Sequence, residues 1–171
     1  METAESGDAM IVIGIDPGIT GAVAAINDGD VVEVWDTPTS QTKVGKKTKT
    51  DYMPSEMSEI FAGYPPSYVH VFIESVHAMP GQGVCSMFGF GKGFGLWLGI
   101  LAALKMPRTL VTPQAWKKEM MQGMRDKDAA RIRAQELFPS LTEKLSRKKD
   151  IGRADAILIC EYGRRILSRG T

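Results

Sequence analysis

Three acidic residues stand at the ends of apolar segments, where a carboxylate is costly to bury. Asp16 follows the run MIVIGI, Glu74 follows VHVFI, and Asp155 interrupts ADAILIC. A buried carboxylate is normally protonated, paired with a cation or bound to a metal ion. Each acid alone is as readily explained by a turn or a salt bridge, but the three together favour a metal site.

The ligands available to such a site favour a hard metal ion. No histidine pair or cysteine cluster accompanies the acids, and Cys85 and Cys160 lack metal-ligand spacing. Carboxylate oxygens favour Mg²⁺ or Mn²⁺ over zinc. Two such ions about 4 Å apart can activate water and stabilise the leaving oxygen in phosphodiester hydrolysis. The residues therefore predict nuclease chemistry.

The elements expected to position these acids form an α/β fold. Three consecutive strands open the chain, with a tight turn in NDGD between the second and the third, and two later strands alternate with helices. This order predicts a mixed five-stranded sheet, three strands antiparallel and then two parallel, flanked by helices. The expected strands are Met10 to Ile15, Gly21 to Ile26, Val31 to Trp35, Val69 to Ile73 and Arg108 to Val111. The expected helices are Met53 to Phe61, Phe94 to Leu104, Pro113 to Met121, Asp126 to Phe138 and Arg153 to Leu167.

Length and composition fit one domain. The chain has 171 residues, 43% hydrophobic and 24% charged, which disfavours disorder and a disulfide scaffold. We expect a disordered acidic tail over residues 1–9 and a single domain over 10–171. The longest apolar run, Phe94 to Leu104, is shorter than the roughly 20 residues that cross a bilayer, so no membrane span is expected. The polar start lacks the features of a signal or transit peptide, and an intracellular, reducing location is expected.

Several motifs carry a family resemblance. The runs IGIDPGITGA, VFIE and RADAIL resemble those of RuvC-type Holliday junction resolvases of the RNase H-like superfamily. The runs VGKK, FGFGKGFGLWLGIL, VTPQAWKKEM, ELFPSL and RKKDIGRADAILICEYG are more similar to the phage, bacterial and monokaryotic-chloroplast branch. The resemblance spans about Met10 to Leu167.

The resemblance implies an RNase H-like fold and a homodimeric, structure-selective endonuclease. Such an enzyme resolves four-way DNA junctions in recombination and genome segregation by paired symmetric nicks on opposed strands. It uses two Mg²⁺ ions per active site, with Mn²⁺ as a substitute, and no nucleotide cofactor. Its location would be nucleoid-associated, in a bacterial or phage-infected cytoplasm or in the chloroplast stroma after removal of a transit peptide.

The same resemblance implies roles for individual residues. Asp16, Glu74 and Asp155 match the acids of the first strand, the fourth strand and the final helix. The family usually adds a fourth ligand about one turn before the last acid, where this sequence has an isoleucine and a glycine. Asp150 is the nearest acid and is a candidate ligand if the helix begins after it. Lys127 matches a basic residue that steadies the scissile phosphate or water, and a solvated lysine is the alternative.

Basic side chains gather in segments that lack acids. The segment Ser40 to Thr50 contains four lysines and no acid, and we expect an exposed polar loop there. The near-neutral total, a net charge of +1, averages such surfaces with the acidic tail and the metal pocket, so a DNA partner is not excluded. The candidate DNA-binding residues are Lys43, Lys46, Lys47, Lys49, Gln82, Phe88, Lys92, Lys117, Lys118, Lys148, Lys149 and Arg153.

The glycine-rich segment His77 to Gly95 is expected to be a mobile loop. A dinucleotide-binding motif does not fit, because that motif joins the first strand directly to a helix. We interpret the segment as an arm whose aromatic side chains stack on bases in the open centre of a junction. The alternative is a disordered surface loop with Phe90 or Phe94 packed in the core.

The sequence leaves the role of the apolar helix Phe94 to Leu104 open between core and dimer interface. Because symmetric cutting needs two opposed active sites, we expect an isologous dimer through this helix. Other functions remain: another RNase H-like nuclease acting on RNA or branched DNA, or a catalytically weak junction-binding protein. An actin-like ATPase would need a second domain and a second phosphate loop, for which the chain is too short.

Overall fold

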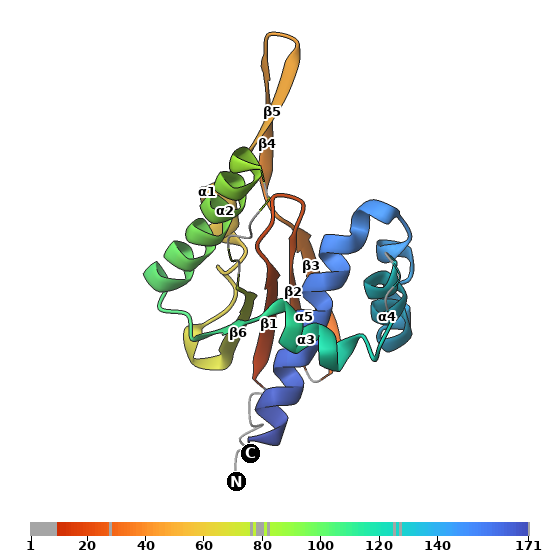
Figure 1. The fold of residues 1–171 in the computed structure, drawn as a ribbon. Coiled ribbons are helices and arrows are strands. Elements are labelled where there is room, and N and C mark those ends of the chain that lie inside the picture. Colours follow the sequence, from red (N-terminus) through yellow and green to blue (C-terminus); the bar gives the residue numbers. More distant parts are fainter. Residues whose placement is uncertain are drawn as a thin grey trace.

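A five-stranded mixed sheet forms the centre of the computed structural model, which describes residues 10–27, 29–75, 77, 81, 83–124, 126 and 128–170. The strands lie in the order β3-β2-β1-β6-β7 (Figure 1). Strands β1, β2 and β3 are antiparallel neighbours, whereas β1, β6 and β7 run parallel, as the sequence predicted. Their bounds are β1 Ile11–Asp16, β2 Ala22–Asn27, β3 Asp30–Asp36, β6 Val69–Glu74 and β7 Arg108–Val111.

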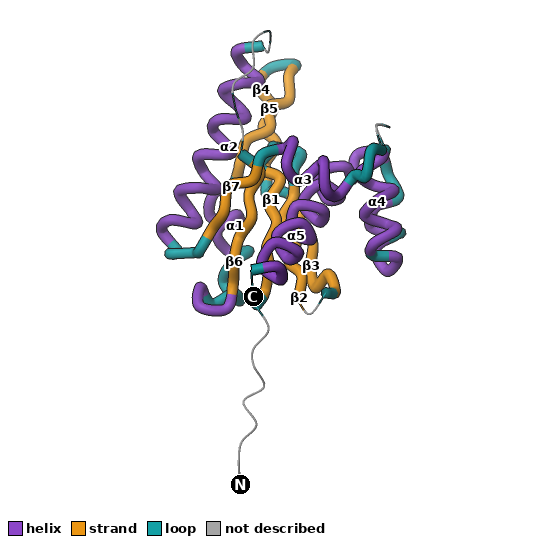
Figure 2. Tube along the Cα trace, turned by 60° about the horizontal axis from the view of Figure 1, so that its bottom comes forward, coloured by secondary structure: helices purple, strands orange, loops and turns teal. Residues whose placement is uncertain are grey.

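Helices cover both faces of this sheet (Figures 1 and 2). α1 and α2 pack on one face, and α3, α4 and α5 pack on the other. The bounds are α1 Pro54–Glu59, α2 Val84–Ala103, α3 Pro113–Met120, α4 Ala129–Leu137 and α5 Ile151–Arg169. Short 3₁₀ turns span Pro66–Tyr68, Pro139–Leu141, Glu143–Leu145 and Lys148–Asp150.

The two cores follow from the alternation of side chains along β1. Val12 points to the face covered by α5, whereas Ile13 and Ile15 point to the face covered by α2, since successive side chains of a strand alternate. All five residues Ala156 to Cys160 of α5 are buried, so this helix is the central element of its layer.

Glycines let α5 lie very close to the sheet. A Cβ atom at Gly14 of β1 would collide with the backbone of Ala156 and lie 2.7 Å from Cα of Cys160. A Cβ atom at Gly152, in the first turn of α5, would lie 2.9 Å from Cα of Gly21. Because these positions lack side chains, the start of α5 is held against the carboxyl end of β1.

The lysine-rich segment forms a β-hairpin, so the expectation of a loop over Ser40 to Thr50 was wrong. β4 (Thr39–Val44) and β5 (Lys47–Tyr52) pair antiparallel as a separate two-stranded sheet that projects beyond the main sheet (Figure 1). Most of its side chains are exposed on both faces, which removes the apolar alternation that normally marks a strand. Its threonines favour extended backbone, and Gly45 adopts the positive φ of 62° that the turn requires.

α2 begins at Val84, so the expectation of a mobile loop up to Gly95 was wrong for residues 84–95. Its glycines lower intrinsic helix propensity by about 1 kcal/mol each, so the sequence of this segment favoured a loop. Gly93, Trp97 and Leu101, spaced four residues apart, form its buried face. Phe94 packs at the edge of the core, whereas Phe90 is exposed.

α2 is the one helix within the described ranges that is long and apolar enough to cross a membrane. This result rests on length and composition only, and core helices of soluble proteins pass the same test. Few of its residues are buried by the rest of the chain, which leaves a broad apolar surface.

Candidate active site

The sheet register brings two of the predicted acids to one edge. β1 and β6 are parallel neighbours, and Ile15 pairs with Ile73. Asp16 and Glu74 are the next residues on each strand, so both carboxylates lie at the carboxyl edge of the sheet. Asp155 reaches the same edge from the start of α5, which the close approach at Gly14 allows.

The charges of these three residues act on one another. Burial, followed by the charge of Glu74, raises the pKa of Asp16 to about 6. Burial, followed by the charge of Asp16, raises the pKa of Asp155 to about 7, and Glu74 adds to that effect. The Gly18 amide, which donates to Oδ1 of Asp16 at 3.3 Å, opposes the shift at that residue. The structure thus brings the three acids together as a centre of negative charge that is only partly compensated.

This centre fits a divalent cation in donor chemistry and in charge. Its donors are carboxylate oxygens, which Mg²⁺ and Mn²⁺ prefer, and a cation would offset both the burial and the repulsion that raise the two pKa values. Within the part of the chain that the structure describes, no three His, Cys, Asp or Glu side chains are grouped closely enough to hold a metal ion as they stand. Metal ligation by Asp16, Glu74 and Asp155 therefore stays a prediction.

α3 supplies two further residues to the site. The fully buried Trp116 donates a hydrogen bond from its indole Nε1–H to Oε1 of Glu74, with the two atoms 2.8 Å apart. Lys117 lowers the pKa of both Asp16 and Asp155, and its Nζ lies 5.1 Å from the centre of the Trp116 ring. Lys117 was predicted as a DNA contact, whereas Trp116 was not predicted, since its partner lies 42 positions away in the sequence.

One of the three acids, Asp155, lines an open cleft. The cleft has a volume of about 760 Å³ and lies between α3, α4 and the start of α5. Asp155 lies on its wall together with Lys117 and Lys118. A polyanionic strand in this cleft would lie beside the Asp155 carboxylate and two cationic side chains.

Comparison with solved structures defines the fold. Residues covering 95% of this chain superpose on 97% of Thermus thermophilus RuvC in complex with a Holliday junction substrate, with a TM-score of 0.62 and 14% sequence identity. A second Thermus thermophilus RuvC structure matches with a TM-score of 0.55 and 16% identity, over 95% of this chain and 98% of that one. This chain has the RuvC fold. The expected RNase H-like architecture is thereby confirmed.

A curated relative is similar in sequence to this RuvC-fold chain. It is the chloroplastic Holliday junction resolvase MOC1 of Chlamydomonas reinhardtii, 26% identical over 148 residues. The match covers 75% of this chain and 17% of MOC1, so the chain corresponds to a small part of that relative's length. No protein-family model matches the chain.

Asp150 of the RuvC-fold chain lies apart from the acidic centre. Its buried carboxylate accepts hydrogen bonds from the Arg147 backbone amide at 2.9 Å and from the Arg147 guanidinium at 2.8 Å. These bonds form a capping box around the 3₁₀ turn before α5 and, led by the Arg147 side chain, hold the pKa of Asp150 below its usual value. The carboxylate of Asp150 is not among the charged groups that shift the pKa of Asp16 or of Asp155. The structure therefore gives this residue a capping role and does not bring it to the other three acids.

The remaining predicted residues fall into three groups. Lys127 and Gln82 lie outside the described residues. Lys43, Lys46 and Lys47 are exposed on the hairpin. Lys118 is exposed on α3, and Lys148 and Lys149 are exposed in the 3₁₀ turn before α5. Phe88 is 75% exposed on α2.

Three of the predicted DNA-binding residues make ion pairs. Lys49 and Lys92 both pair with Asp51 at the base of the hairpin, which ties β5 to α2. The Arg153 guanidinium pairs with Asp36 of β3, with its Nε and Oδ1 of Asp36 2.6 Å apart. Part of the expected basic surface thus holds elements of the fold together.

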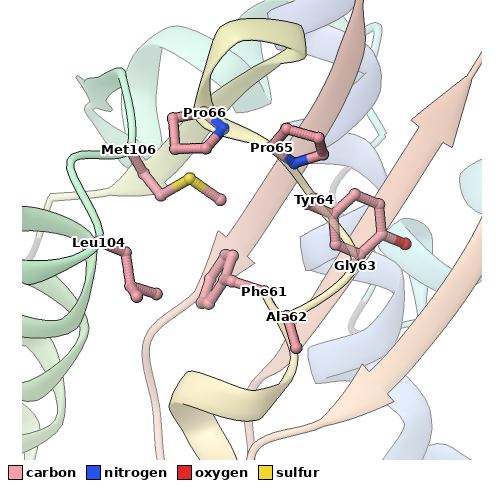
Figure 3. Close-up of a pocket in the computed structure, with 8 residues that line it drawn as sticks. All are labelled: Phe61, Ala62, Gly63, Tyr64, Pro65, Pro66, Leu104 and Met106. Atoms are coloured by element: carbon pink, nitrogen blue, oxygen red, sulfur yellow. The ribbon is translucent and has the colours of Figure 1, made fainter.

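A second pocket, of about 370 Å³, lies away from the acidic centre (Figure 3). Its lining is apolar and combines the segment after α1 with the end of α2. The lining residues are Phe61, Ala62, Gly63, Tyr64, Pro65, Pro66, Leu104 and Met106. This pocket offers no group suited to hydrolysis.

Proposed function

We propose that this chain is a structure-selective DNA endonuclease that resolves four-way (Holliday) junctions by paired symmetric nicks. The observation that carries the proposal is the group of three coupled carboxylates, Asp16, Glu74 and Asp155, at the open edge of a RuvC-fold sheet. The similarity to a chloroplastic junction resolvase supports the same activity. Its role would be in recombination and genome segregation, in a plastid or in another compartment that holds DNA.

In this proposal Asp16, Glu74 and Asp155 hold two Mg²⁺ ions, for which Mn²⁺ substitutes. When bound, such ions would supply an activated water and positive charge at the leaving oxygen of the scissile phosphodiester. The chain itself contributes Lys117, whose charge already acts on two of the acids and can also attract the phosphate. Lys127, predicted from the resemblance, would be a second basic group, and Asp150 is left out because Arg147 occupies its carboxylate.

The hairpin is the proposed arm for backbone phosphates. It projects from the body of the molecule and carries exposed Lys43, Lys46 and Lys47 (Figure 1). Lysines that neutralise phosphates supply most of the sequence-independent affinity for DNA. Phe88, exposed on the neighbouring start of α2, is the proposed stacking residue for bases at the centre of the junction.

α2 is the proposed dimer interface. Gly91, Gly95 and Gly99 repeat every four residues on its exposed side, opposite the buried face, and a Cβ atom at each would meet nothing within 4 Å. A row of small residues permits two helices to approach closely, and Val84, 85% exposed, adds apolar surface. An isologous contact through α2 would give the two opposed active sites that symmetric nicking needs.

Substrate choice tests the proposal. The purified protein is incubated with a mobile four-way junction, linear duplex DNA or structured RNA, in Mg²⁺ or Mn²⁺. We expect paired nicks at opposed positions of the junction and little cleavage of the other two substrates. Preferential cleavage of RNA would support another RNase H-like nuclease. Tight junction binding without nicks in either metal would support a binding protein.

A further inference from the structure

A buried hydrogen bond connects α3 to one of the three acids. The indole Nε1–H of Trp116 donates to Oε1 of Glu74 over 2.8 Å. Trp116 is fully buried in the core layer that also contains Phe72 and Met120, so its ring has little freedom to turn. The donor therefore holds one oxygen of the carboxylate in a fixed direction.

The local fold explains why the indole reaches Glu74. Glu74 pairs with Val111 at the end of β7, and the next amide, that of Ser75, donates to the Val111 carbonyl at 2.7 Å. α3 starts directly afterwards, with Thr112 as its N-cap and a proline in its first turn. Trp116 lies about one turn into the helix, so its ring comes back over the end of β6.

A neutral donor is well suited to a carboxylate that must bind a cation. An arginine or lysine in this place would neutralise the charge of Glu74 and compete with a metal ion. An indole has one N–H and no positive charge, so it orients the carboxylate and leaves the charge intact. Partners of this kind behind metal ligands commonly raise metal affinity.

We infer that Trp116 is a positioning residue that orients Glu74 toward the metal ions of the proposed resolvase. The inference rests on the proposed function, since it assumes that Glu74 is a metal ligand. Lys117 lies over the same ring, with Nζ 5.1 Å from the ring centre. The indole thus contacts both Glu74 and the Lys117 side chain.

Trp97 offers a matched control. It is as fully buried as Trp116, but it lies in the other core layer, and its Nε1 has no hydrogen-bond partner in the described part of the chain. Trp116→Phe and Trp97→Phe therefore remove similar buried volume, while Trp116→Phe alone removes a bond to an acid of the site.

Calorimetric titration of the DNA-free protein with Mg²⁺ or Mn²⁺ tests the inference. We expect Trp116→Phe to bind the metal about 10- to 100-fold more weakly than the unsubstituted protein. Trp97→Phe should bind within about twofold of it, since only an indirect effect remains. Equal affinity of Trp116→Phe and the unsubstituted protein would overturn the inference and leave the proposed function intact. Absence of metal binding to the unsubstituted protein would overturn both.

A second measurement does not depend on the folding of Trp116→Phe. The protein has three tryptophans and so three indole N–H resonances in a ¹⁵N–¹H spectrum. Trp35→Phe and Trp97→Phe assign two of them, and the third belongs to Trp116. We expect Mg²⁺ to shift the Trp116 resonance most. A shift confined to the Trp35 or Trp97 resonance, or none during demonstrated metal binding, would contradict the inference.

Discussion

The acids of the site repel one another, and one lysine does not balance them. Asp16, Glu74 and Asp155 together carry up to three negative charges, and the cation that acts on two of them is Lys117. Burial and mutual repulsion therefore favour the protonated forms of Asp16 and Asp155. A group of this kind gains most from a bound divalent cation, which replaces the missing positive charge.

This arrangement predicts an unusual dependence of stability on pH. The folded-state pKa values of Asp16 and Asp155, about 6 and about 7, lie above the usual value of 3.8. Their contribution to stability is thus complete below pH 4 and is lost as the pH rises through 6 to 7. We expect the thermal unfolding midpoint of the metal-free protein to decrease as the pH is raised from 5 to 8.

Mg²⁺ should restore the midpoint at pH 8 and have little effect at pH 5, where the carboxylates are largely protonated. Asp155→Asn serves as the control, and its metal-free midpoint should fall less over the same range. Asp36 and Asp150, whose pKa values are lowered mainly by hydrogen bonds from Arg153 and Arg147, titrate below this window. His70, whose pKa is lowered by burial, contributes with the opposite sign in both proteins. A change of the metal-free midpoint from pH 5 to pH 8 that is the same in Asp155→Asn and in the unsubstituted protein would contradict the assigned environment of Asp155.

The acids that could be predicted from the sequence are those whose position in an apolar run already indicates a special role. Asp16, Glu74 and Asp155 end or interrupt apolar runs, and the fold brings them together. Asp150 could not be placed in this way, because its pairing with Arg147 depends on the geometry of a short 3₁₀ turn. The link between Trp116 and Glu74 joins residues 42 positions apart, and no local pattern marks it.

At the scale of elements, the sequence predicted the central sheet but not the hairpin β4–β5 or the first half of α2. β1, β2 and β6 each carry a buried apolar run, which is a strong local pattern. The hairpin β4–β5 and the first half of α2 lack such a pattern, because most of their side chains face solvent. Both elements therefore resembled loops, although pairing and packing fix them.

The close contact of α2 with the hairpin and with the end of β1 predicts opposite effects of two similar substitutions. A Cβ atom at Gly93 would collide with the Tyr52 ring and lie 2.8 Å from the Pro17 carbonyl, whereas one at Gly89 would meet nothing within 4 Å. We expect Gly93→Ala to destabilise the fold by about 1–3 kcal/mol through overpacking. Gly89→Ala, outside the glycine row of the proposed dimer interface, should stabilise it by up to about 1 kcal/mol through helix propensity. Urea unfolding at one protein concentration measures the stability of both variants. Equal unfolding midpoints would exclude close packing at Gly93.

The hairpin lysines should account for a measurable part of the salt dependence of DNA binding. We predict that the double substitution Lys46→Ala, Lys47→Ala weakens junction binding and lowers the slope of log K against log salt by up to about 2. Lys105→Ala, just after the far end of α2, should leave the slope unchanged. Junction affinity is measured by anisotropy across a salt series, and an unaltered slope in the double variant would remove the hairpin from the interface.

At the scale of the whole molecule, symmetric cutting requires two copies. Gly95 lies at the middle of the exposed glycine row of α2. A Cβ atom at this position would meet no other atom of the described chain within 4 Å. We expect Gly95→Glu to yield a folded monomer, because the new side chain meets nothing within one chain but separates two packed helices. Ser86→Glu, exposed on a different side of the first turns of α2, should remain dimeric.

Light scattering after size exclusion gives the mass of each variant. In the monomeric Gly95→Glu variant, nicking of the two opposed strands should become uncoupled. A dimer of unchanged stability in Gly95→Glu would place the interface elsewhere.

The central claim is that the carboxylates at the open edge of this RuvC-fold sheet drive metal-dependent cleavage of four-way junctions. Asp16→Asn tests it most directly, since the change removes one charge with almost no change in shape. Cleavage rate and binding affinity are measured on the same junction in Mg²⁺. The account predicts that cleavage falls at least about a hundredfold while affinity is retained. Cleavage at the unsubstituted rate by Asp16→Asn would contradict it.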